Sequence, residues 1–279
     1  MKTIFTLNLF LILILSLKTA NSHEFWIEPE EFFVQPDDVV TANLRIGQMM
    51  SGNALGYFPN GFLRFEIETG SIRKNIEGRI GDSPALVSKI LEEGLTIIIH
   101  ETQKSFLTYT DWKKFKAFLH DKALNNIEKI HIESGYEKTH FAEAYSRFAK
   151  TLIASGDGQG QDKSFGMETE FVMLSNPFAE NSQNEVKLQL LYKNLPRKNV
   201  QVEVFKKNSN DVITQIKLFT NIFGVVTIPT QRDSTYMINS VKMRPFIFTD
   251  SKSERTMNVL WESLWASIVF KIPRKSLHH

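Results

Sequence analysis

Cysteine is absent from the 279 residues of this chain. Its absence excludes disulfide bonds, thiolate metal sites and a catalytic cysteine. Long apolar runs are also missing beyond residue 17, so no later stretch is long enough to span a membrane. The fold must therefore be stabilised by a hydrophobic core, and a hydrophobic content of 42% with 22 Phe is ample for one.

An excess of charge of either sign is missing as well. The chain has 33 Lys and Arg against 31 Asp and Glu, and Lys2 and Lys18 both fall within the first 22 residues. Without those two lysines the remaining chain is formally neutral. A nucleic-acid-binding protein usually has a basic surface, so we expect no nucleic-acid partner.

The first 22 residues have the pattern of an export signal. Lys2 provides a basic start, residues 4–17 are almost continuously apolar, and Ala20 and Ser22 are small residues just before an expected cut. This pattern predicts cleavage after Ser22, a mature chain that begins at His23, and a periplasmic or secreted protein without a transmembrane segment. The alternative is an uncleaved N-terminal anchor.

Short runs rich in β-branched and aromatic residues recur along most of the chain and are separated by turn residues. Val200, Val202 and Val204, for example, alternate with polar residues, as in a half-buried strand. We expect strands at residues 32–34, 39–46, 62–67, 95–100, 168–174, 186–190, 200–204, 215–219, 225–228, 236–243 and 264–272. Short strands at this spacing predict a mainly β protein of the sandwich type.

Two helices are predicted between the strands, in a segment of about residues 110–154. Thr110 or Asp111 can cap the first, in which Trp112, Phe115 and Phe118 recur at helical spacing. We expect the second helix over residues 139–154, with a stripe formed by Phe141, Ala144, Tyr145, Phe148 and Leu152.

The glycine-rich residues 155–162 then read as a flexible linker, and Ser175-Asn176-Pro177 indicates a domain boundary. We therefore expect a β-rich N-terminal domain at 23–179, containing the two helices, and a C-terminal β-sandwich domain at 180–279.

His23 is the candidate metal ligand. A histidine at the first position of a mature chain presents its imidazole and a free α-amine on one residue, so the two nitrogens can chelate one metal ion. Neutral nitrogen ligands suit Cu(II), Ni(II) or Zn(II). The alternative is a histidine that cleavage happens to leave in solvent.

Other residues are needed to complete such a site. His100 and His140 are the candidates, with Glu24 next to His23. His100 can equally be a histidine with satisfied hydrogen bonds at a strand end. His120 and His131 fall in the charged helical region, where we expect them to be exposed.

His140 and Glu143 are three residues apart and would face one ion from a helix. The alternative is a solvated helical face that also carries Arg147 and Lys150. His278 and His279 read as a tail.

Patterns of several enzyme classes are missing, among them the G-x-S-x-G elbow and the P-loop. Asp157 and Asp162 lack the spacing of an EF-hand calcium loop. Trp261, Glu262 and Trp265 lie in one short segment. Two tryptophans there can form an aromatic platform for a sugar or pack inside the protein.

Four segments, in order, resemble an uncharacterised bacterial periplasmic family that is often labelled as the substrate-specific component of nickel or cobalt uptake. They are His23-Glu24-Phe25-Trp26-Ile27-Glu28-Pro29, Tyr145-Ser146-Arg147-Phe148-Ala149-Lys150-Thr151-Leu152, Gly166-Met167-Glu168-Thr169-Glu170-Phe171 with Asn176-Pro177, and Trp261-Glu262-Ser263-Leu264-Trp265-Ala266-Ser267.

This resemblance implies an exported protein with an Ig-like or transthyretin-like C-terminal half and a role in metal handling. The family motifs include His23, Glu24, Arg147 and Lys150. The first hypothesis is a periplasmic accessory protein that binds Ni, Co, Cu or Zn and presents it to a membrane transporter. The alternatives are a copper redox enzyme that uses the N-terminal histidine, and a metal-free β-sandwich that binds a ligand or partner.

Overall fold

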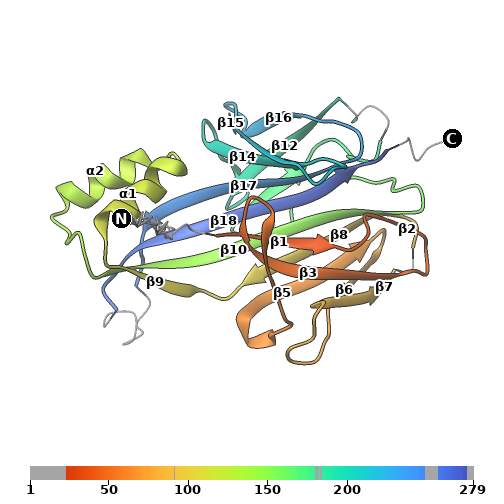
Figure 1. Cartoon of the computed structure of the whole chain (residues 1–279), viewed down its shortest axis with the longest axis horizontal. Coiled ribbons are helices and arrows are strands. Elements are labelled where there is room, and N and C mark those ends of the chain that lie inside the picture. The colour runs from red at the N-terminus through yellow and green to blue at the C-terminus, as the bar shows by residue number, and fades with distance from the viewer. Residues whose placement is uncertain (1–22, 91, 180–181, 183, 249–256, 275–279) are drawn as a thin grey trace, which may run out of the picture.

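The computed structural model describes residues 23–90, 92–179, 182, 184–248 and 257–274. The expected export signal and the terminal His278 and His279 lie outside these residues. The described chain is mainly β, as the sequence predicts, and its strands form three sheets (Figure 1). No helix in the described part is both long enough and apolar enough to cross a membrane.

A ten-stranded sheet runs through the middle of the molecule. Its strands are, in spatial order, β15 (Ile213–Phe219), β14 (Gln201–Lys207), β17 (Ser234–Pro245), β18 (Val259–Ile272), β10 (Phe141–Ser155), β8 (Gly94–Thr102), β5 (Phe62–Thr69) and β6 (Ile72–Asn75), while β2 (Phe33–Val34) and β9 (Ser105–Tyr109) also pair with β10. The long strands β10 and β18 lie side by side and run parallel.

Two smaller sheets cover this central sheet. One contains β1 (Glu24–Pro29), β3 (Val39–Gln48), β4 (Ser51–Leu55) and β7 (Leu86–Lys89). The other contains β11 (Thr169–Met173), β12 (Glu185–Tyr192), β13 (Leu195–Pro196) and β16 (Val225–Pro229).

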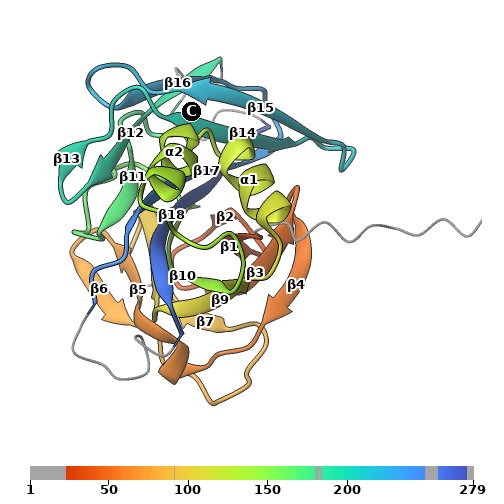
Figure 2. The same cartoon turned by 90° about the vertical axis from the view of Figure 1, so that its left-hand side faces the viewer.

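Alternation along β10 places the two smaller sheets on opposite faces. Ala149 and Ile153 pack in a core with residues of β1 and β3, whereas Phe148 and Leu152 pack in a core with residues of β11 and β12. Figure 2, which looks along the long strands, shows the smaller sheets on opposite sides of β10 and β18. The result is a layered β-sandwich with a separate core on each side of its central sheet.

Two helices cover one end of the face on which β1 lies. Helix α1 (Trp112–Asp121) begins after Asp111, whose side chain accepts a hydrogen bond from the Lys113 N–H at 2.8 Å, so the expected cap is confirmed. Helix α2 (Asn125–Glu133) follows directly. Phe115 and Phe118 of α1 pack against β18 in a third core. A 3₁₀ turn, η1 (Pro59–Gly61), precedes β5.

The expected helix over residues 139–154 is wrong, since Phe141–Ser155 form the strand β10. Its apolar residues fit a helical stripe, but they fit equally well a central strand that is buried on both faces, which shows no clean alternation. Tertiary packing overrides the helix propensity of the Ala, Glu and Lys residues in this segment. The second helix lies earlier, at α2.

The central sheet combines strands from both sides of the expected domain boundary near residue 180. Strands β5, β6, β8 and β10 come before it, and β14, β15, β17 and β18 come after it. The division into domains 23–179 and 180–279 stays a prediction.

Candidate functional site: a cavity beside His23

A cavity of about 490 Å³ opens between the start of β1 and helix α1. Both elements cover the same face of the central sheet, and the cavity is the space left where they do not meet. Strands β9 and β10 contribute much of its lining, and α1 contributes one wall. The residues used below are His23, Tyr109, Phe118, Glu143, Arg147 and Trp265.

Strand alternation explains which side chains of β10 reach this cavity. Glu143, Tyr145 and Arg147 line it, whereas the intervening Ala144 and Ser146 do not. Successive side chains of a strand point to opposite faces, so residues two apart share a face. One short segment therefore supplies a carboxyl, a phenol and a guanidinium group to the cavity.

Glu143 is buried and both of its carboxyl oxygens are hydrogen-bonded. The Tyr109 hydroxyl donates to Oε2 at 2.8 Å, and the Ser263 hydroxyl donates to Oε1. The Trp265 indole N–H donates in turn to Ser263 Oγ at 2.9 Å. Burial raises the pKa of Glu143 to about 7, although the two hydroxyl donors oppose the rise. This carboxyl is thus held in place and is not free to bind a metal ion.

Arg147 is half-buried and forms no ion pair with any described residue, unlike the buried Lys122 and Lys150. The buried Arg197 also lacks an ion pair, but its guanidinium donates to Thr169 and to the Val241 carbonyl. The Nε of Arg147 is buried without a hydrogen-bond acceptor. Its guanidinium carbon lies 4.5 Å from the centroid of the Tyr145 ring, a cation–π contact. Burial lowers the pKa of Arg147, and the Tyr145 side chain and then Glu143 only partly oppose this. The cavity wall therefore contains a positive charge with no carboxylate paired to it.

His23 is exposed and lines the same cavity. The neighbouring Glu24 is buried and lies 3.2 Å from Lys122 Nζ, which also contacts Glu203 at 2.8 Å. Burial disfavours the charge on Lys122, but Glu203 and Glu24 together raise its pKa. Glu24 is therefore the counter-ion of a buried lysine, and it fixes the start of β1 rather than lining the cavity.

Two further hydrogen bonds hold β1 on the central sheet. Thr151 Oγ1 of β10 donates to the Ile27 carbonyl at 2.8 Å, and Ser267 Oγ of β18 donates to the Phe25 carbonyl at 2.7 Å. The backbone that leads to His23 is thus attached to both long strands.

His100 and His140 occupy different surroundings from His23, and neither lines the cavity. His100 is buried among phenylalanine rings with centroids 4.9 to 5.2 Å away, and neither ring nitrogen has a hydrogen-bond partner. The interpretation of His100 as a satisfied strand-end histidine is therefore wrong. His140 is exposed just before β10, so the helical pair of His140 and Glu143 does not exist.

His120 is exposed, as expected, but His131 is not. His131 Nδ1 accepts a hydrogen bond from the Trp261 indole N–H at 3.0 Å, and its Nε2 lies 2.9 Å from the Glu137 carbonyl oxygen. Trp261 is fully buried beneath the helices. Trp261 therefore packs inside the protein and forms no sugar platform.

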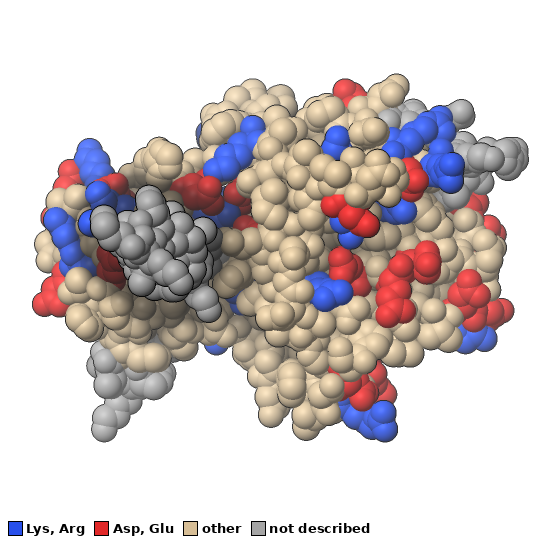
Figure 3. All heavy atoms as spheres, viewed as in Figure 1, with Lys and Arg blue, Asp and Glu red and all other residues tan. Residues whose placement is uncertain are grey.

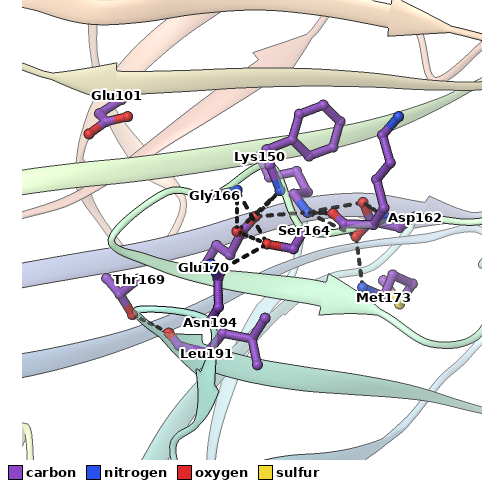
Figure 4. A network of polar contacts seen from close by, with 12 residues as sticks. Glu101, Lys150, Asp162, Ser164, Gly166, Thr169, Glu170, Met173, Leu191 and Asn194 are labelled. Carbon is purple, nitrogen blue, oxygen red and sulfur yellow. Dashed lines mark hydrogen bonds and ion pairs between the residues drawn. The ribbon is translucent and has the colours of Figure 1, made fainter.

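Lys150 is also buried, which corrects the expectation of a solvated face (Figure 4). Its Nζ lies 2.9 Å from Asp162 and 3.6 Å from Glu170, and both carboxylates are inaccessible to solvent. Glu170 also accepts hydrogen bonds from the backbone N–H groups of Phe165 and Gly166. This network ties the loop after β10 to the central sheet, so Lys150 has a structural role.

Glu262 forms a second structural cluster. Arg244 Nη2 lies 2.7 Å from Glu262 and Arg244 Nη1 lies 2.6 Å from Glu168, while Lys104 Nζ lies 3.2 Å from Glu262. Glu262 alternates with Trp261 and Ser263 along β18, so it belongs to the face away from the cavity.

On the face of the molecule drawn in Figure 3, Lys and Arg are interspersed with Asp and Glu rather than gathered in one basic patch.

A metal ion would find few ligands in the protein. Within the described residues no group of three or more His, Asp or Glu is placed to hold one. A site at His23 would therefore depend on the α-amine as its second donor. The remaining coordination positions would be left to water or to a bound ligand.

The raised pKa of Glu143 predicts a pH-dependent stability. The folded pKa of about 7 lies above the ordinary 4.5, so the stabilising contribution is present below pH 4.5 and is lost as the pH rises through 7. The expected loss is about 3 kcal/mol. Urea unfolding of the wild type between pH 4.5 and pH 8 should show this decrease, and Glu143→Gln should lack it. Parallel pH profiles for the two proteins would contradict the assignment.

The sequence identified His23 but missed most of the residues around it. Tyr109 and Trp265 come from distant strands, and their burial beside Glu143 depends on the tertiary fold. One signal was present: Glu143, Tyr145 and Arg147 recur with a period of two, which places them on one face of a strand. The helix prediction concealed this pattern.

The fold and the site together define a class: a mainly β protein of layered sheets with a ligand-sized cavity at the start of its first strand. The chain belongs to the DUF4198 family, a domain of unknown function whose family model matches residues 20–243. A search of curated proteins finds no match.

Two solved structures align with the chain at low similarity. The D0-D1 domain of intimin is 10% identical, with 88% of this chain and 97% of that one covered and a TM-score of 0.20. A tetra-tandem repeat from the extending region of a large adhesion protein is 8% identical, with 89% of this chain and 49% of that one covered and a TM-score of 0.20. These TM-scores are too low to indicate a shared fold or function.

Proposed function

We propose that this protein is an exported accessory protein that binds one transition-metal ion at its mature N-terminus. His23 would chelate the ion through its α-amine and imidazole nitrogens. The supporting observation is the position of His23 at the wall of the 490 Å³ cavity. A bound ion there would be accessible from outside and would have coordination positions free for exchange with a partner such as a membrane transporter.

Ligand chemistry decides which metal is expected. Two nitrogen donors favour Cu(II) over Ni(II), Co(II) and Zn(II) in the usual order of divalent affinities. Nickel and cobalt would then depend on availability or on additional ligands. Glu24 and Glu143 are engaged in internal contacts with Lys122 and Tyr109, so we do not assign them as ligands.

The experiment is a Cu(II) titration of the protein that begins at His23, followed by the d–d absorption band or by calorimetry. The matched control carries an acetyl group on the His23 α-amine, which keeps the imidazole but converts the amine to an amide and leaves no free amine at the terminus. We expect this control to bind Cu(II) about 100-fold more weakly, because one of two linked donors is lost. Equal affinity of the two proteins would rule out the chelate, as would a mature N-terminus other than His23 in mass spectrometry.

A further inference from the structure

Arg147 is the feature of the cavity that the metal proposal leaves unused. Two buried lysines in the described chain, Lys122 and Lys150, each have carboxylate partners. Arg147 is half-buried, lines the cavity and forms no ion pair with any described residue, and its buried Nε has no hydrogen-bond acceptor there. Burying an unpaired charge is costly, and a bound anion would remove that cost.

Glu143 does not supply this anion. It acts on Arg147 less than the Tyr145 side chain does, and both of its oxygens already accept hydrogen bonds from Tyr109 and Ser263. The contact that Arg147 does make is with the Tyr145 ring, which fixes the plane of the guanidinium but does not neutralise it. The charge of Arg147 is thus held in place beside an open volume.

The rest of the cavity wall indicates what kind of anion fits. Leu107, Phe118 and Trp265 contribute apolar lining, while Lys114 adds a second positive charge and Asp111 a negative one. The volume of about 490 Å³ lies in the range of small-molecule sites. Apolar residues and a cation that line one cavity suit an organic anion better than a small inorganic one.

We propose that this cavity binds a small organic acid whose carboxylate pairs with Arg147 and whose apolar part packs against Phe118 and Trp265. The organic acid would bind in the cavity that also contains the proposed metal site, and its binding to Arg147 does not require the metal. If the proposed metal function holds, the substrate is a metal ion together with the organic acid, whose carboxylate would occupy coordination positions that His23 leaves open. Charge-assisted bidentate hydrogen bonds from arginine to a carboxylate provide the specificity.

Calorimetric titration of the metal-free protein that begins at His23 tests the proposal, with benzoate and its neutral analogue benzamide as probes. Benzoate should bind, and benzamide should bind at least tenfold more weakly, about the effect of losing a charge-assisted hydrogen bond. Equal binding of the two, or no binding of benzoate, would overturn the proposal. Tighter binding of inorganic phosphate than of benzoate would also overturn it.

Substitutions locate the charge that is responsible. Arg147→Met should weaken benzoate binding about 10- to 100-fold. Lys114→Met, which removes an exposed cation from the same cavity, should change it by less than about threefold. Unchanged affinity in Arg147→Met would refute the assignment. If that variant does not fold, Arg147→Lys keeps the charge but loses the bidentate geometry, and should bind benzoate more weakly than wild type.

The metal and acid proposals can fail separately. Benzoate binding without Cu(II) binding would exclude the metal function and leave the acid site supported. Cu(II) binding without benzoate binding would exclude the acid site alone. The protein acetylated at the His23 α-amine should lose Cu(II) affinity while it retains benzoate binding, because Arg147 is unaffected by that change.

Discussion

Replacing Lys150 by methionine is expected to lower the free energy of unfolding by about 3–5 kcal/mol. Lys150 Nζ lies 2.9 and 3.1 Å from the two carboxylate oxygens of Asp162. Water does not reach this ion pair, because both side chains are inaccessible to solvent. Methionine fills a similar volume but leaves Asp162 and Glu170 buried as unpaired carboxylates. Urea unfolding monitored by tryptophan fluorescence measures the change.

Two control variants show how much of the expected Lys150→Met destabilisation comes from burial of the ion pair and how much from the loss of its positive charge. Lys89 forms an ion pair with Asp37 at 2.8 Å, but both side chains are more than half exposed. Lys89→Met is therefore expected to cost less than about 1 kcal/mol. The double variant Lys150→Met with Asp162→Asn should recover part of the loss, because one of the stranded charges is removed. A Lys150→Met protein as stable as the wild type would show that the network is not stabilising.

The second large effect is acid destabilisation through His100. Burial lowers the pKa of His100 to about 3 from an ordinary 6.5, because the charged imidazole would lie among phenylalanine rings. A neutral His100 contributes stability above pH 6.5, and that contribution is lost as the pH falls through 3. The total loss from this group is about 5 kcal/mol.

His100→Phe should remove most of this acid sensitivity. The variant also eliminates two ring nitrogens that lack hydrogen-bond partners among the described residues. Its stability at pH 7 should therefore fall by less than the acid-induced loss of about 5 kcal/mol. Unfolding curves at several pH values between 7 and 3 compare the two proteins. His100→Leu serves as a smaller replacement in case phenylalanine overpacks the core. Identical acid sensitivity of the wild type and both variants would mean that His100 is not the group responsible.

The sequence predicted the β class because its signals are local. Val202 and Val204 alternate with polar residues in β14, which Val200 directly precedes, and Asp111 caps α1 next to apolar residues at helical spacing. The spacing of apolar residues within a single strand or helix shows which of its faces is buried, so these patterns can be recognised without knowing the rest of the fold. The mainly β sandwich is accordingly confirmed.

The sequence failed where burial depends on distant partners. Lys150 was expected in solvent because residues 139–154 were predicted as a helix with a polar face, but its counter-ion Asp162 buries it. His131 was expected in solvent because its segment is charged, but its partner Trp261, 130 residues away, lies in the core. Helix α2 was missed because Leu124 provides no side-chain cap and the segment is rich in charge. The cavity needed the same long-range information. His23 alone could be identified, since its chemistry depends on its position in the chain.

The pairing of β10 with β18 has a consequence for the order of folding. Residues 142–151 find their parallel partners at residues 259–269, more than one hundred residues later in the chain. The central sheet cannot close until nearly the whole polypeptide is present, and contacts this distant slow folding. Because Ser267 of β18 also holds the backbone at Phe25, the residues at the start of β1 reach their final position only when β18 arrives. A polypeptide truncated before β18 would therefore contain His23 without the cavity beside it.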